Sequence, residues 1–69
     1  MPYVHVRVTR EDVTPEHKRA IIAGVTELLV KTLDKSPATT FVVIEEVELE
    51  DWGVGGLPVS EYRKRSRSE

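Results

Sequence analysis

Apolar and polar residues alternate along the first part of the chain. From Tyr3 to Thr9, Val4, Val6 and Val8 fall on one face, while aromatic and polar residues fall on the other. A period of two residues is typical of a β-strand with one buried face. The pattern predicts a half-buried strand over residues 3–9.

The next apolar pattern has helical spacing. It follows Thr14, Pro15 and Glu16, which offer an N-cap hydroxyl, a proline at the first helical position and an acid in the first turn. The apolar residues then recur three and four positions apart, at Ile21, Ile22, Val25, Leu28, Leu29 and Leu33. The polar break at 34–37 ends in a proline, which disfavours helical geometry in the residue before it. We expect one helix with a single apolar stripe.

A second strand is expected over residues 39–47. Its centre, from Phe41 to Ile44, is apolar on both faces, which is typical of a strand covered from two sides. The order strand, helix, strand makes the two strands parallel, because a crossover of this length joins parallel neighbours. One helix covers only one face of such a pair. The other face is therefore expected to be covered by a second copy of the chain.

The last part of the chain contains an acidic run, a glycine-rich turn and a basic end. After the acidic residues 45–51, Trp52 to Gly56 has the backbone freedom of a tight turn or hairpin. Residues 61–69 are polar and locally basic, which favours a solvated or disordered tail. The expected fold class is α/β: a β-α-β protomer with two parallel strands and a C-terminal hairpin or turn. Residues 2–60 form this domain, and the basic tail follows it.

Chain length and cysteine content point to an oligomer. The 69 residues include no cysteine, so no disulfide supports the fold. His5 and His17 are twelve positions apart with no paired-ligand spacing around them, so we expect no metal site. Small folds without these supports usually depend on partner subunits. A homo-oligomer is the remaining expectation.

The formal net charge of −2 provides no general attraction to nucleic acid or to an anionic membrane. The longest uncharged run of the helical region is too short to cross a bilayer, and no apolar signal segment follows Met1. We expect a cytoplasmic protein without nucleic-acid or membrane partners.

Pro2 is the candidate for chemistry. Removal of Met1 would leave a secondary amine at the first position of a strand, where the sheet holds it in place. Free α-amino groups titrate at about 8, and burial lowers that pKa toward the range that suits proton transfer. The alternative is that proline in second place is only a processing signal. The carboxylates at 45–51 could also act as an acid–base pair, but we favour a solvated strand end.

Several of these features together resemble one family. Pro2 opens an alternating strand, Thr14 begins an amphipathic helix, the strand over 41–46 follows, and the chain reaches Trp52-Gly53-Val54-Gly55-Gly56. In this order and spacing they resemble the tautomerase superfamily, specifically the short 4-oxalocrotonate tautomerase group, over residues 2 to about 60. The resemblance implies dimers that share a four-stranded sheet, usually assembled as a trimer of dimers, and an isomerase without a cofactor.

The resemblance also implies roles for individual residues. Pro2 would move a proton between carbons of an enol or dienol acid such as 2-hydroxymuconate. Trp52 matches an aromatic residue that keeps the pocket dry, and Val54 matches an apolar wall position. The family's two substrate-binding arginines align here with about Val13 and with Phe41. Arg10, in the same loop as Val13, is a candidate substitute for the first arginine, whereas nothing obvious replaces the second. The substrate is thus left open.

Two other functions stay open on the same residues. The amine of Pro2 could serve hydration, dehalogenation or decarboxylation of a small unsaturated acid, with Glu45 or Glu46 activating water. Alternatively, the missing arginines could mean a non-catalytic subunit of an oligomer, paired with an arginine-bearing relative.

Overall fold

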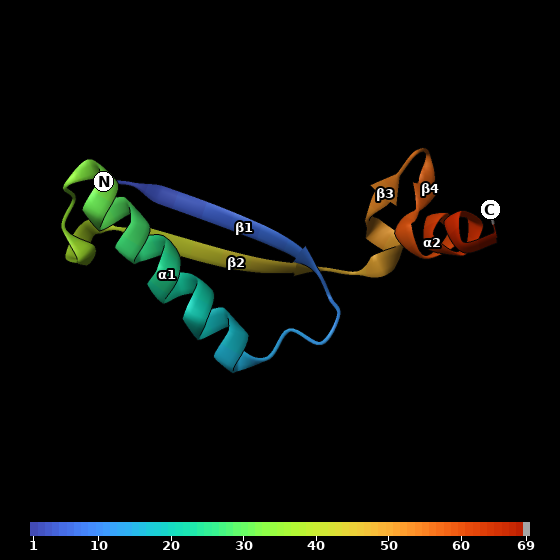
Figure 1. Ribbon diagram of the computed structural model, residues 1–69, viewed down its shortest axis with the longest axis horizontal. Helices are drawn as coiled ribbons and strands as arrows, with labels where there is room; N and C mark the ends of the chain where they lie inside the picture. The colour runs from blue at the N-terminus through green and yellow to red at the C-terminus, as the bar shows by residue number, and fades with distance from the viewer. Residues whose placement is uncertain (69) are drawn as a thin grey trace.

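The computed structural model describes residues 1–68, with side chains described for residues 1–65. Two strands, β1 (Tyr3–Thr9) and β2 (Phe41–Val47), pair in parallel, with Tyr3 opposite Phe41 and Thr9 opposite Val47 (Figure 1). This confirms the predicted parallel pair. β2 begins later than expected, because Pro37–Thr39 forms a short 3-10 helix, η1.

Helix α1 (Pro15–Leu33) begins after the predicted N-cap at Thr14 and ends at the predicted polar break over 34–37. The Thr14 hydroxyl accepts a hydrogen bond from the His17 amide at 3.1 Å, and the Thr14 amide donates to His17 Nδ1 at 3.1 Å. Each side chain thus accepts a hydrogen bond from the backbone amide of the other residue, which is the arrangement of a capping box. Asp34 then closes the helix in the left-handed conformation, with φ of 55°.

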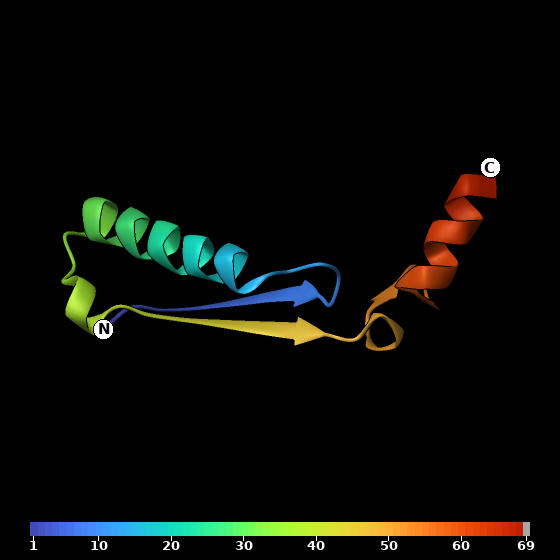
Figure 2. The ribbon, with the colours of Figure 1, turned by 90° about the horizontal axis from the view of Figure 1, so that it is seen from below.

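The β1–β2 pair has one covered face and one open face. α1 lies along one side of the strands, and no element of the described chain lies along the other (Figure 2). The face toward α1 is partly buried and carries Val4, Val6, Val8, Val42, Ile44 and Glu46. On the open face, Phe41 is 46% exposed and Val43 is 44% exposed. The prediction that one helix leaves an apolar face uncovered is confirmed.

The chain continues beyond the end of β2 into a small separate body, which we call the arm (residues 49–68). It contains η2 (Leu49–Asp51), the antiparallel hairpin of β3 (Gly53–Val54) and β4 (Leu57–Pro58), and helix α2 (Val59–Ser68), all of which lie away from α1 (Figure 1). The predicted hairpin is confirmed. Its two-residue turn consists of Gly55 and Gly56, both with positive φ (58° and 87°), as tight hairpins of this kind require.

The arm has a core of its own. Among residues 1–65, Val59 is the one buried side chain, with 6% of its surface exposed. Its amide donates to the Trp52 carbonyl at 2.8 Å. The Tyr62 ring lies beside the hairpin turn, since a Cβ placed on Gly55 would lie 3.4 Å from it.

The basic end differs from its prediction. Where the sequence favoured a solvated or disordered tail over residues 61–69, the structure has α2 continuing to Ser68, with exposed side chains over 61–65, and Glu69 lies outside the described residues. α2 begins at Val59, so the domain boundary expected at residue 60 falls in its first turn. The segment lacks an apolar stripe, but burial of Val59 and an acid in the first turn, Glu61, favour a helix start.

Candidate active site

Pro2 is held by the sheet, at the end where β1 begins. Its carbonyl oxygen accepts a hydrogen bond from the amide of Phe41 at 3.0 Å. Pro2 itself is partly buried, whereas Met1 before it is 83% exposed. A backbone bond to the neighbouring strand fixes the position that an amine of Pro2 would occupy.

Aromatic side chains follow Pro2 along the open face of the sheet. Tyr3 and Phe41 are register partners on the open face. The rings of Tyr3 and His5, two residues apart on β1, have their centroids 6.3 Å apart. On this face Tyr3 is 61% exposed and Phe41 is 46% exposed, so one chain alone does not enclose Pro2.

Charged groups on the open face lie further along the strands and neutralise one another. The Glu45 carboxylate lies 2.9 Å from His5 Nε2 and 3.1 Å from Arg7 Nε. This carboxylate, which was a candidate for activating water, is therefore held between two basic side chains.

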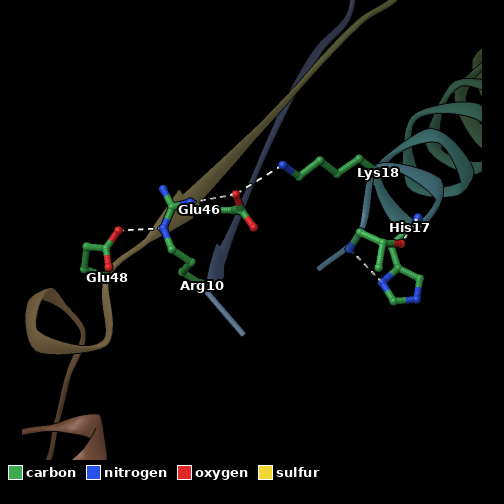
Figure 3. A network of polar contacts seen from close by, with 6 residues as sticks. Arg10, His17, Lys18, Glu46 and Glu48 are labelled. Carbon is green, nitrogen blue, oxygen red and sulfur yellow. Dashed lines mark hydrogen bonds and ion pairs between the residues drawn. The ribbon is translucent and has the colours of Figure 1, made fainter. Parts of the chain in front are cut away.

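Arg10 lies at the opposite end of β1, in a network with two carboxylates (Figure 3). Its Nε donates to Glu48 at 2.5 Å and its terminal nitrogen donates to Glu46 at 3.2 Å. Glu46 also accepts from Lys18 on α1 at 3.1 Å, and only 15% of its side chain is exposed. The two cations and two carboxylates balance. A substrate anion at Arg10 must compete with Glu46 and Glu48.

Sequence reasoning did not pair Arg10 with these carboxylates. The signal was present, because in a parallel pair the ends of β1 and β2 lie together, and the acidic run over 45–51 spans the end of β2. The Arg10 amide bonds to the Val47 carbonyl at 2.8 Å, which brings the two segments into contact.

One chain does not bring the candidate residues together. Phe41 adjoins Pro2, but Arg10 is eight residues along an extended strand, which amounts to roughly 26 Å at about 3.3 Å per residue. Trp52 and Val54 lie in the arm, beyond the far end of β2 (Figure 1). Any pocket that contains them all must combine residues from more than one copy.

Within the described part of the chain, no group of three potential metal ligands comes together. No described helix has the length and apolar character needed to cross a membrane.

A parallel β-α-β unit that opens on a proline and leads into a glycine hairpin is the arrangement expected of small tautomerases. The chain belongs to the tautomerase family: the family described as Tautomerase enzyme matches residues 2–62. It is 54% identical over 66 residues to the probable tautomerase K2 of Dickeya dadantii strain 3937, a match covering 96% of this chain and 98% of that protein.

Solved structures agree with this assignment. DmpI from Helicobacter pylori has a TM-score of 0.83 and 35% identity, over 91% of this chain and 97% of that one. A 4-oxalocrotonate tautomerase isozyme from Methylibium petroleiphilum has a TM-score of 0.84 and 28% identity, over 93% and 98% of the two chains. The chain is an enzyme of the 4-oxalocrotonate tautomerase-like group, with a tautomerase or isomerase type of function.

Proposed function

We propose that the chain, once Met1 is removed, uses the amine of Pro2 to isomerise an enol or dienol acid to its keto form. The observation that carries this proposal is the position of Pro2: it opens β1, and its carbonyl bonds to the Phe41 amide at 3.0 Å. The neutral amine takes a proton from one position of the substrate and returns it to a carbon. The substrate therefore changes its bonding but not its atoms, and no cofactor takes part.

Two physical effects support this role for Pro2. In the proposed assembly, burial of the amine between neighbouring copies would disfavour the ammonium form and so bring the pKa of the Pro2 amine toward the working pH. A dry site also strengthens the interactions that stabilise negative charge on the enolate intermediate.

We propose a homo-oligomer in which neighbouring copies complete each pocket. Antiparallel pairing of two β1 edges would extend each two-stranded sheet to four strands and bring Arg10 of one copy toward Pro2 of the other. Contact between the open faces, with Phe41 and Val43, would then assemble such dimers into a trimer of dimers. The support is the open apolar face together with the roughly 26 Å between Pro2 and Arg10 along β1.

In this assembly, Trp52 and Val54 form the pocket wall and Arg10 binds the substrate carboxylate. Phe41 adds apolar surface beside Pro2, and Arg10 already donates to Glu46 and Glu48. The site therefore suits an enol acid with one carboxylate and an apolar body better than a dicarboxylate such as 2-hydroxymuconate.

The test compares the processed chain with a chain that carries one bulky residue between Met1 and Pro2, which prevents removal of Met1. Enol–keto conversion is followed by absorbance, and mass spectrometry verifies the N-terminus of each preparation. We expect the blocked chain to be slower by a factor of about 10²–10⁴, the usual contribution of a general base. Pro2→Ala keeps a primary amine and retains part of the rate. Equal rates for the blocked and processed chains would refute the proposal.

A further inference from the structure

A buttressed ion pair connects the arm to the loop that follows β1. Both terminal nitrogens of Arg63, on α2, donate to the two oxygens of the Glu11 carboxylate, one of them at 3.0 Å. The Thr9 hydroxyl donates to the same carboxylate from the end of β1. Two-point contacts between a guanidinium and a carboxylate fix orientation as well as distance.

The charge of this pair persists over a wide range of pH. The hydrogen bonds from Arg63 and Thr9 and the positive charge of Arg63 lower the pKa of the Glu11 carboxyl from 4.5 to about 2. The same contact raises the pKa of Arg63. At neutral pH both partners carry full charge.

Within the arm, Arg63 is mechanically linked to Trp52. Val59, one turn before Arg63 on α2, is buried and donates its amide to the Trp52 carbonyl at 2.8 Å. Tyr62, next to Arg63, packs against the hairpin at Gly55. A shift of Arg63 relative to Glu11 would therefore carry the hairpin and Trp52 with it.

We infer that the Glu11–Arg63 pair, the arm clamp, is a positioning device: it holds the arm at one orientation to the β-α-β unit, and so presents Trp52 and Val54 at the place where a pocket needs its wall. Neither partner touches the substrate. The effect on catalysis rests on the proposed function, whereas the effect on the orientation of the arm rests only on the contacts above.

Trp52 makes this inference measurable, because it is the single tryptophan of the chain. The variants are Glu11→Gln, Arg63→Gln, the conservative Arg63→Lys and the charge reversal Glu11→Arg with Arg63→Glu, each checked for folding by circular dichroism. Glu27→Gln is the matched control, since it breaks an exposed Glu27–Lys31 pair at 2.7 Å that lies within α1. Acrylamide quenching of Trp52 and the separate values of kcat and KM are the readouts.

We expect either glutamine variant to raise the quenching constant of Trp52 about twofold and KM about three- to tenfold, with a smaller change in kcat, because the pocket wall is displaced. Arg63→Lys should fall between the parent and Arg63→Gln, and the charge reversal should recover at least part of the loss, as coupled residues do. Glu27→Gln should match the parent.

Unchanged quenching in both glutamine variants would overturn the inference, as would a charge reversal no better than the single variants. If quenching rises while KM stays constant, the arm is clamped but does not form the pocket wall, which also overturns it. If the parent turns over no enol acid, the proposed function fails, and quenching alone then decides whether the clamp orients the arm.

Discussion

The β-α-β unit, residues 1–48, and the arm, residues 49–68, bury their side chains in different ways. The unit has the long elements of the fold, but its open face leaves Phe41 and Val43 about half exposed. The arm is made of short elements, yet it buries Val59 and closes a tight turn with Gly55 and Gly56.

The comparison shows that the unit depends on other copies of the chain to bury its side chains, whereas the arm buries them within itself. The unit cannot complete its burial within one chain, because α1 covers only one face of β1 and β2 (Figure 2). The arm packs against itself, and the clamp between Arg63 and Glu11 sets its relation to the unit. Changes in the unit should therefore act on assembly, and changes in the arm should act on local stability and the pocket.

The largest expected effect comes from a charge on the open face of the unit. Val43→Asp places a carboxylate on a surface that we expect to be covered, and burying an unpaired charge costs several kcal/mol. Association should weaken by at least about 100-fold, since each 1.4 kcal/mol is a factor of ten. Sedimentation velocity measures the loss, and activity should fall with it. Ala23→Asp, on the exposed side of α1, is the control. An unchanged sedimentation coefficient for Val43→Asp would contradict an interface on this face.

Val59→Ala tests the core of the arm. Removing two methyl groups from a site that is 6% exposed should lower the free energy of unfolding by about 1–3 kcal/mol. Urea titration followed by Trp52 emission measures this directly. Thr32→Ala removes a side chain of similar size from an exposed site on α1 and should change stability by less than about 0.5 kcal/mol. Equal effects of the two substitutions would mean that the arm has no core of its own.

Two glycines, one in each region, should respond to alanine with opposite signs. Gly55 has φ of 58° and Tyr62 in contact range, so Gly55→Ala should destabilise by about 1–2 kcal/mol. Gly24 lies inside α1 with open space around it, so Gly24→Ala should stabilise by about 0.5–1 kcal/mol. Thermal unfolding of both variants checks the pair. The same sign for both would contradict the turn geometry.

The smallest expected effect is the pH dependence of the clamp. Because the pKa of Glu11 falls from 4.5 to about 2 in the folded chain, its contribution to stability is complete above 4.5 and is lost as the pH falls through about 2. The parent should therefore lose stability over this range relative to Glu11→Gln, whose amide does not titrate. Urea midpoints at several pH values measure the difference in stability between the parent and Glu11→Gln. If this difference did not change with pH, the clamp would not favour the ionised carboxylate.

The unit could be predicted from its sequence almost residue by residue, because its signals are periodic. Alternation located β1, the N-cap at Thr14 and the polar break at 34–37 delimited α1, and the two-sided apolar centre of β2 implied an uncovered face. Only the start of β2 was wrong, where Pro37 sets a 3-10 turn.

The arm was harder to predict, because individual contacts between residues far apart in the sequence position it, and no repeating pattern reveals them. A hairpin could be expected from Gly55 and Gly56, but α2 has no apolar stripe from which a helix could be predicted. The Glu11–Arg63 pair joins residues 52 positions apart, and no local pattern connects them. The candidate site shares this difficulty, since Pro2, Arg10 and Trp52 do not meet within one chain.

The central claim is that a free amine of Pro2 lies in a dry pocket between copies. NMR titration of the Pro2 nitrogen in the processed oligomer, labelled with ¹⁵N-proline, tests it most directly. The account predicts a pKa clearly below the value of about 8 that is usual for a free α-amino group. A pKa at or above about 8 would indicate an amine in bulk water, and would contradict the account.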